Sequence, residues 1–273
     1  MKGITGLLLA ASLLPMGVLA WSTPGKDFSG TLTLGGPVTH TRNPWLWKIG
    51  GGSHELHAPR RAQWSRNGQQ IIPVPLPALT LLLGKTRAPA PAGGVGLAPD
   101  VTYGKGIAGF SLQWTAPGQA EVVLPLTGDN RSHPGQLVFR IEAAALLRSQ
   151  PAAPSATPTG GATTSSASHA DAALNQALYN DLRGNGLPPA GAMLPREQTA
   201  AHLQAMFAGE GPAWLATLRL PGVAGLSQFR NTALHQVEGV YGARLVAGSG
   251  ELRLNGAIPA HWQVSLPVSI DYP

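Results

Sequence analysis

The residues that could carry out chemistry are few and widely spaced. The chain of 273 residues contains 13 Asp and Glu and 8 His, and it contains no Cys. The absence of thiols excludes cysteine nucleophiles, zinc–thiolate sites and iron–sulfur clusters. No G-x-S-x-G motif of a serine nucleophile occurs, and most acidic residues stand beside turn residues. The sequence therefore predicts a protein that is not an enzyme and that needs no cofactor.

Two short motifs suggest chemistry but lack the context for it. Residues 104–109 read G-K-G-I-A-G, which matches G-x-G-x-x-G, but strand-like residues follow where a dinucleotide site needs a helix. We therefore interpret this motif as a turn that enters a strand. His54 and His57 have a spacing that could bind a metal on a helix, but Gly52 and Pro59 flank them and no third ligand is evident. No metal site is predicted there.

Composition narrows the class of protein further. Charged residues make up 12% of the chain, and 35 Gly and 25 Pro favour strands joined by many turns. The net charge is +6, but the Lys and Arg residues are scattered and are not interleaved with aromatic residues. This pattern argues against a nucleic-acid partner.

The first twenty residues predict an export signal. Lys2 provides a positive start, residues 7–19 are almost wholly apolar, and Ala20 ends a small-residue cleavage site. An apolar run of this length spans about 20 Å as a helix, which is short of the bilayer core of about 30 Å. We expect the mature chain to begin at Trp21 and to be exported.

Both ends of the mature chain have the alternating pattern of a two-faced strand. Residues 27–39 read D-F-S-G-T-L-T-L-G-G-P-V-T, and Pro37 should end that strand or place it at an edge. The apolar positions of this first strand are Phe28, Gly30, Leu32, Leu34, Gly36 and Val38. Those of the last strand are Trp262, Val264, Leu266, Val268, Ile270 and Tyr272.

The residues between these two strands predict a mainly β domain with a few short helices. We expect a flexible Pro/Ala/Ser/Thr-rich loop over residues 150–170. Strands are predicted at 45–49, 79–83, 107–114, 121–126 and 135–142, with an extended edge segment at 70–77 and a hairpin of 241–246 with 251–254. Helices are predicted at 171–182 and 196–207, followed by a helical turn at 212–220.

The two ends together resemble fimbrial subunits of the FaeG type, which are pilins of the chaperone–usher pathway. The similar stretches are A-W at the cleavage point, residues 27–39, W-L-W-K-I-G at 45–50, L-L-L-G-K-T at 81–86 and the last strand. This chain departs from the pattern at Pro267, within the last strand, and at Pro273, where the family has an aromatic residue. Pro267 removes one backbone donor, so one neighbour must tolerate a missing bond.

The resemblance implies an immunoglobulin-like β-sandwich that lacks its final strand. In such pilins a periplasmic chaperone lends a strand, and at the outer-membrane usher the N-terminal extension of the next subunit replaces it. The resemblance divides this chain into a signal (1–20), a donor extension (21–39) and a pilin domain (40–273) with a helical insertion at 171–220. The first strand would then fill a neighbouring subunit, and the last strand would form the edge that the chaperone grips.

Alternatives to a structural pilin remain at this stage. An ordinary first strand would pair within its own domain, and the chain would then be a secreted monomeric binding module or an enzyme. A third reading is an adhesin on the same fold that binds a host glycan receptor, with Tyr179 and Trp214 as candidate contacts, although such residues more often serve packing. A cell-surface fimbria is the location that the resemblance implies.

Overall fold

The structure is a mainly β fold, as the sequence predicts. The computed structural model describes residues 44–50, 56, 64–129, 134–150, 175–179, 184–218, 223–227 and 229–273. The strands in these ranges are β1 (Trp45–Ile49), β2 (Trp64–Arg66), β3 (Gln69–Val74), β4 (Thr80–Thr86), β5 (Ala90–Ala92), β6 (Asp100–Tyr103), β7 (Ser111–Ala116), β8 (Gln119–Pro125), β9 (Thr127–Gly128), β10 (Gly135–Gln150), β11 (Asn175–Tyr179), β12 (Val223–Ser227), β13 (His235–Leu245), β14 (Gly250–Leu254), β15 (Trp262–Gln263) and β16 (Val268–Asp271). The helical elements are η3 (Ala190–Ala192), α1 (Arg196–Phe207) and α2 (Ala213–Thr217).

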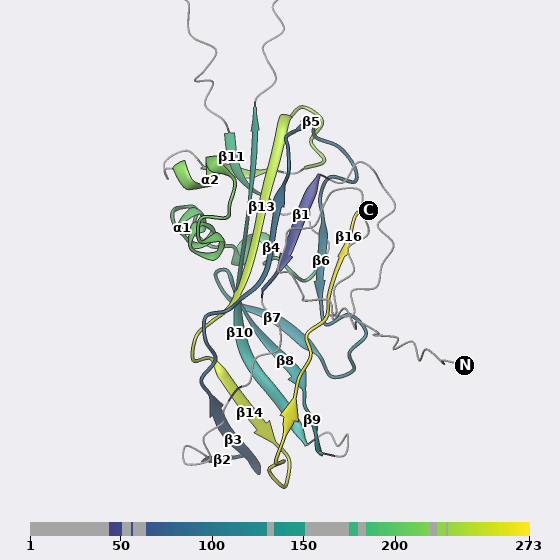
Figure 1. Ribbon diagram of the computed structural model, residues 1–273, viewed down its shortest axis with the longest axis vertical. Helices are drawn as coiled ribbons and strands as arrows, with labels where there is room; N and C mark the ends of the chain where they lie inside the picture. The colour runs from purple at the N-terminus through teal and green to yellow at the C-terminus, as the bar shows by residue number, and fades with distance from the viewer. Residues whose placement is uncertain are drawn as a thin grey trace, which may run out of the picture.

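Strand β10 is the element around which the sheet is built. It is 16 residues long and runs through both halves of the molecule (Figure 1). Along one edge it pairs first with β14 and then with β13, and along the other edge it pairs with β8 and β11. In the upper half of Figure 1, β4 and β1 extend the sheet beyond β13. In the lower half, β3 and β2 extend it beyond β14, and β7 follows β8.

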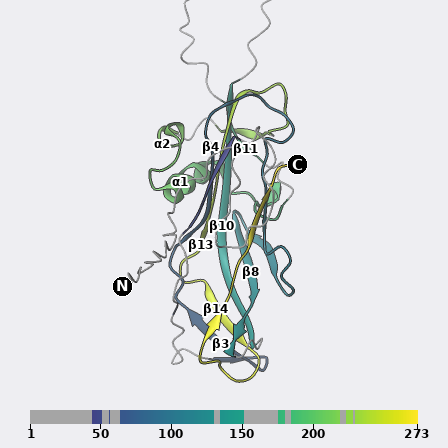
Figure 2. The same ribbon diagram turned by 45° about the vertical axis from the view of Figure 1, so that its right-hand side comes forward.

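The two faces of the upper sheet carry different coverings. The helices α1 and α2 lie on one side of β10 and β13, and β16 lies on the other side in both views (Figures 1 and 2). The alternation of side chains along β10 explains this division. Ala145 and Leu147 belong to the main core, and Leu146 between them belongs to a second apolar cluster beneath the helices.

The main core is anchored by aromatic residues of β1. Trp45 and Trp47 point to the same face of the strand and stack with ring centroids 5.2 Å apart. Trp45 also contacts Phe229, and Trp47 contacts Tyr241. The alternation in W-L-W-K-I therefore predicts both the strand at 45–49 and its buried face, and both are confirmed.

Gly84 in β4 gives Trp47 its room, and this leads to a stability prediction. A Cβ atom at residue 84 would lie 2.3 Å from the ring of Trp47. We expect Gly84→Ala to lower the free energy of unfolding by about 1–3 kcal/mol, because the buried ring has to move. Urea denaturation measures the change. Gly94→Ala is the matched control, since a Cβ there meets no atom within 4 Å, and equal losses for the two variants would contradict the prediction.

The second apolar cluster holds the helices to the sheet. Leu203, Met206 and Phe207 of α1 are buried, together with Leu215 of α2. Helix α1 spans residues 196–207 and α2 lies within residues 212–220, so both helical predictions are confirmed. Gly242 of β13 allows the close approach, because a Cβ there would lie 2.8 Å from the sulfur of Met206.

The predicted helix at 171–182 is wrong. Residues 175–179 form strand β11, which pairs antiparallel with β10 and parallel with β12. The leucines spaced by four suggested a helix, but the edge of β10 beside Leu147 and Arg148 offers ladder hydrogen bonds to this segment. Tertiary pairing has therefore overridden local propensity. The predicted loop at 150–170 lies almost entirely outside the described residues.

The predicted hairpin of 241–246 with 251–254 is also wrong, although both strands exist. Strands β13 and β14 do not pair with each other, because the chain continues in one direction along β10 from β13 into β14. The connection is held by Val246 N–H, which donates to Arg140 O at 2.9 Å, and by Gly248 N–H, which donates to Leu76 O at 2.8 Å. The turn residues at 248–250 therefore belong to the connection that takes the chain from β13 in the upper half of the sheet to β14 in the lower half.

Candidate functional site

The C-terminal segment is the candidate site, and it forms two short strands where one long strand was predicted. Strand β15 pairs with β9, and β16 pairs with β6. Residues 264–267 between them are assigned to no strand. Pro267 ends this gap, so the continuity that was predicted for residues 262–272 is wrong.

The two-faced character of the C-terminal segment is confirmed. Val268 is buried, and the other apolar members of the pattern are half-buried against the main core. Tyr272 accepts a hydrogen bond from the indole N–H of Trp47 at 2.6 Å, which ties the penultimate residue to β1. The half-buried residues are Trp262, Val264, Leu266, Ile270 and Tyr272.

Strand β6 is paired on both edges. One edge carries β16, and residues 184–187 occupy the other edge. Asn185 accepts a hydrogen bond from Tyr103 N–H at 2.7 Å through its side-chain oxygen and donates from Nδ2 to Tyr103 O at 3.0 Å. Gly186 N–H donates to Val101 O at 2.9 Å. We call residues 184–187 the edge clamp, because they imitate the backbone groups of a neighbouring strand.

A buried pair of tyrosines supports the edge clamp. The hydroxyl of Tyr241 donates to Gly186 O at 2.8 Å and lies 3.0 Å from the hydroxyl of Tyr103. Burial raises the pKa of Tyr103 well above its usual range, and the hydrogen bond to Tyr241 opposes that rise. The Tyr103 hydroxyl therefore stays neutral at physiological pH, and the two hydroxyls act as hydrogen-bonding groups.

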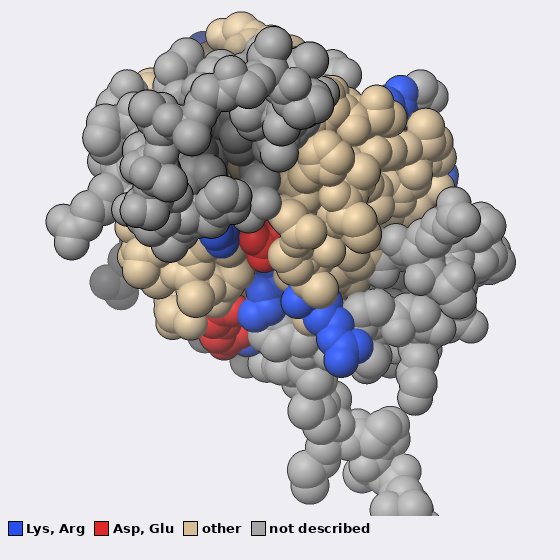
Figure 3. All heavy atoms as spheres, turned by 90° about the horizontal axis from the view of Figure 1, so that it is seen from above, with Lys and Arg blue, Asp and Glu red and all other residues tan. Residues whose placement is uncertain are grey.

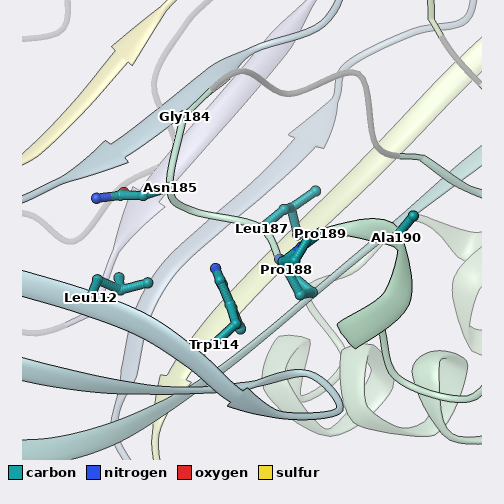
Figure 4. Close-up of a pocket in the computed structure, with 8 residues that line it drawn as sticks. All are labelled: Leu112, Trp114, Gly184, Asn185, Leu187, Pro188, Pro189 and Ala190. Carbon is teal, nitrogen blue, oxygen red and sulfur yellow. The ribbon is translucent and has the colours of Figure 1, made fainter.

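A pocket of about 390 Å³ lies between β7 and the residues around the edge clamp. Figure 4 shows the indole of Trp114 standing in this space below Asn185 and Leu187. No charged side chain lines the pocket. In the described part of the chain, the indole N–H of Trp114 has no hydrogen-bond partner. The lining residues are Leu112, Trp114, Gly184, Asn185, Leu187, Pro188, Pro189 and Ala190.

The candidate receptor contacts differ in what the structure shows of them. Trp214 is buried in the second apolar cluster, and the guanidinium of Arg148 lies 5.7 Å from its ring centroid. This placement favours packing over contact with a sugar. Tyr179 lies at the end of β11 in the backbone, and its side chain is outside the described residues.

Charged side chains at the surface form pairs of opposite sign. Seen from above, basic and acidic side chains lie next to one another in a short strip (Figure 3). Lys48 contacts Glu210 at 2.6 Å, and Arg148 contacts Glu238 at 3.3 Å. Burial lowers the pKa of Lys85, and the nearby Glu210 opposes this change.

Glu238 leads to a prediction about pH. Burial raises the pKa of this carboxyl, and the Arg148 guanidinium and the Trp214 indole oppose the rise. The fold favours the protonated form of Glu238. The stability that this form contributes is complete below the ordinary pKa of 4.5 and is lost as pH rises through the higher pKa of the folded state. We expect Glu238→Gln to lose this component of the pH dependence. Thermal melts from pH 4 to pH 7 test it, with Glu251→Gln as control, and identical profiles for wild type and Glu238→Gln would disprove it.

The remaining motifs behave as turns or lie elsewhere. Gly104, Gly106 and Gly109 have φ of 71°, 83° and 80°, so G-K-G-I-A-G forms the turn between β6 and β7 that was predicted. Among the described residues no group of three or more His, Asp or Glu could hold a metal ion. None of the described helices is long and apolar enough to cross a bilayer. The two histidines near residue 55 lie outside the described residues.

The predicted donor strand also lies outside the described residues. The residues concerned are Phe28, Gly30, Leu32, Leu34, Gly36 and Val38, within the predicted extension 21–39, and the predicted signal 1–20 precedes them. The edge clamp was missed by sequence reasoning. Its one local signal is G-N-G at 184–186, a turn-forming sequence that does not reveal a partner about 80 residues earlier in the chain.

Comparison with known proteins adds two findings. A family model described as "Fimbrial, major and minor subunit", of the K88 type, matches residues 1–273. The K88 minor fimbrial subunit FaeI of Escherichia coli is 50% identical to this chain over 273 residues, which are 100% of this chain and 100% of that protein. Both matches include the two terminal segments that lie at the centre of the sequence argument.

Proposed function

Since the chain belongs to the family of K88 major and minor fimbrial subunits, and is therefore a subunit of a fimbria exported to the cell surface, we propose that it is assembled by donor-strand exchange. In this proposal a periplasmic chaperone first lends a strand to the C-terminal edge. At the outer-membrane usher, the N-terminal extension of a neighbouring subunit then replaces it. Residues 27–39 of this chain serve the next subunit in the same way.

The observation that carries the proposal is that β16 is paired along one edge. Its buried face packs on the main core, but in the described part of the chain it pairs with β6 alone. A strand with one open edge and a half-buried apolar face suits β-strand addition, in which backbone bonds provide affinity and side-chain pockets provide specificity. The closed second edge of β6 supports the proposal further, because among the described residues it leaves the far edge of β16 as the unpaired edge of this two-stranded sheet.

The state of the exported protein tests this function. We expect it to be recovered as fibres, or as a one-to-one complex when a chaperone of the pathway is expressed with it, by size-exclusion chromatography and electron microscopy. The protein without any chaperone should be short of one strand and should aggregate or be degraded. Recovery of a stable monomer without a chaperone would instead mean that the first strand pairs within its own domain.

A further inference from the structure

We propose that Pro267 is placed so that it leaves intact the edge of the C-terminal segment that receives the incoming strand, an inference that rests on the proposed function. The missing N–H of this proline faces β6, so the opposite edge keeps an unbroken row of backbone donors and acceptors. We call this opposite edge the outer edge. Its occupant is an extended segment with the chemistry of residues 27–39, supplied by a second copy of this chain or a similar subunit.

The direction of Pro267 follows from the register of β16 against β6. Gly104 N–H donates to Pro267 O at 2.9 Å, and the residue numbers of this pair continue the register that joins Tyr103 to Val268. In an antiparallel ladder, hydrogen-bonded pairs alternate with non-bonded pairs. Ser269 and Asp271 therefore face β6 with their backbone groups, as Pro267 does, and Val268 and Ile270 face the outer edge.

The contacts of the edge clamp show independently that the odd-numbered residues of β16 face β6. Tyr103 N–H and C=O both bond to the Asn185 side chain, and Val101 C=O accepts from Gly186 N–H. Because the backbone groups of Val101 and Tyr103 point to the clamp, those of residues 100, 102 and 104 point to β16. Two sets of contacts on opposite edges of β6 thus assign the same direction to β16.

The proline leaves no buried backbone group without a partner. In a complete ladder, Gly104 C=O would accept the N–H of residue 267. Here Gly104 C=O accepts from Ile107 N–H at 3.1 Å, within the turn that Gly104 begins with a φ of 71°. The turn therefore supplies the donor for Gly104 C=O that Pro267 cannot supply. The missing hydrogen bond of Pro267 affects only the edge that faces β6.

The outer edge consequently carries no proline within β16, which ends at Asp271. In the described part of the chain, Val268 and Ile270 have no backbone partner on that side. Pairing of an incoming strand with these residues would also cover the half-buried side chains of Leu266 and Ile270. A proline one position earlier or later would interrupt this row, so the parity of Pro267 matters more than its presence.

Amide hydrogen exchange of the full mature chain, measured directly after its release from the chaperone, tests the parity. Without added ligand, we expect the amides of Ser269 and Asp271 to exchange at least about tenfold more slowly than those of Val268 and Ile270. Saturation with a synthetic peptide of residues 27–39 should then slow the Val268 and Ile270 amides to a similar degree. The reverse order of exchange, or slow exchange at all four amides before peptide is added, would overturn the inference.

Two proline variants one residue apart provide the matched comparison. Ile270→Pro removes an outer donor, and we expect it to bind the peptide about tenfold more weakly than Ile270→Ala, which loses the same half-buried side chain but keeps the donor. Ser269→Pro removes an inner donor, and it should lower the melting temperature while peptide affinity stays within about threefold of wild type. Pro267→Ala should change neither quantity appreciably, because Gly104 C=O is already bonded.

The outcomes separate this inference from the function on which it rests. Equal loss of peptide binding in the two proline variants overturns the assignment of the outer edge. A wild-type chain that binds no peptide but keeps the expected exchange pattern overturns donor-strand exchange at this edge, and the direction of Pro267 stands. If the odd-numbered amides are protected before peptide is added and the even-numbered amides only after it, both the direction of Pro267 and donor-strand exchange at the outer edge are supported.

Discussion

Deleting residues 21–38 should yield a subunit that a periplasmic chaperone still binds but that cannot serve as a donor in the fibre. The reason is that the C-terminal edge, which is proposed to receive a strand, pairs in the described part of the chain with β9 and β6, and both strands lie outside residues 21–38. The truncated subunit should therefore stand only at the fibre end that donates to no neighbour, and it should be excluded from internal positions. Incorporation at internal positions, measured by gel analysis of purified fimbriae and by fibre length in electron micrographs, should fall to near zero.

Single substitutions within residues 27–39 sharpen this test. Leu32 lies on the apolar parity and Thr33 on the polar parity. Burial of one Leu side chain stabilises by about 1.5–3 kcal/mol, so Leu32→Asp should weaken donation by about 10–100-fold. Thr33→Asp carries the same charge on the other face and should stay within about threefold of wild type. Normal polymerisation of the truncated chain, or equal effects of the two substitutions, would contradict donation by this segment.

Replacing Asn185 with Ala should open the closed edge of β6. The substitution leaves both backbone groups of Tyr103 without their partners, and each unsatisfied buried group costs about 1–3 kcal/mol. We expect a loss in the free energy of unfolding of about 2–6 kcal/mol, measured by denaturation of the chaperone-released subunit or of a complex with the 27–39 peptide.

Asn185→Asp is the matched control for this experiment. An aspartate can still accept from Tyr103 N–H, but it cannot donate to Tyr103 O, so its cost should fall between wild type and Asn185→Ala. The open edge of β6 should also make Asn185→Ala more prone to aggregate than the control. An alanine variant as stable as wild type would show that the edge clamp has no part in holding β6.

The terminal segments were predictable because a period of two needs no knowledge of the partner. In the W-L-W-K-I stretch, the positions of Trp45 and Trp47 alone identify the buried face of β1. The same reasoning found the buried face of residues 262–272. It did not find the break before Val268. The sequence shows that Pro267 has no backbone N–H, but which edge of the strand lacks that donor depends on the pairing with β6.

The errors and omissions share one physical cause, which is pairing between residues far apart in the sequence. The leucines at 174, 178 and 182 satisfy a helical spacing, and only the nearby edge of β10 makes residues 175–179 a strand. Likewise, nothing within G-N-G at 184–186 indicates that Asn185 will bond to both backbone groups of Tyr103. Helix α1 was predictable because its start, its end and its apolar residues are all local.

The length of β10 has a consequence for how the subunit bears load and comes apart. Because its two ends belong to different halves of the sheet, neither half has a complete set of strands of its own. The chain also passes from β13 to β14 and from β3 to β4 at the same level, so two further connections cross where β10 does. Unfolding of either half would remove hydrogen-bonding partners from the strands of the other. We therefore expect the described part of the subunit to unfold as one cooperative unit and not to bend where the two halves meet.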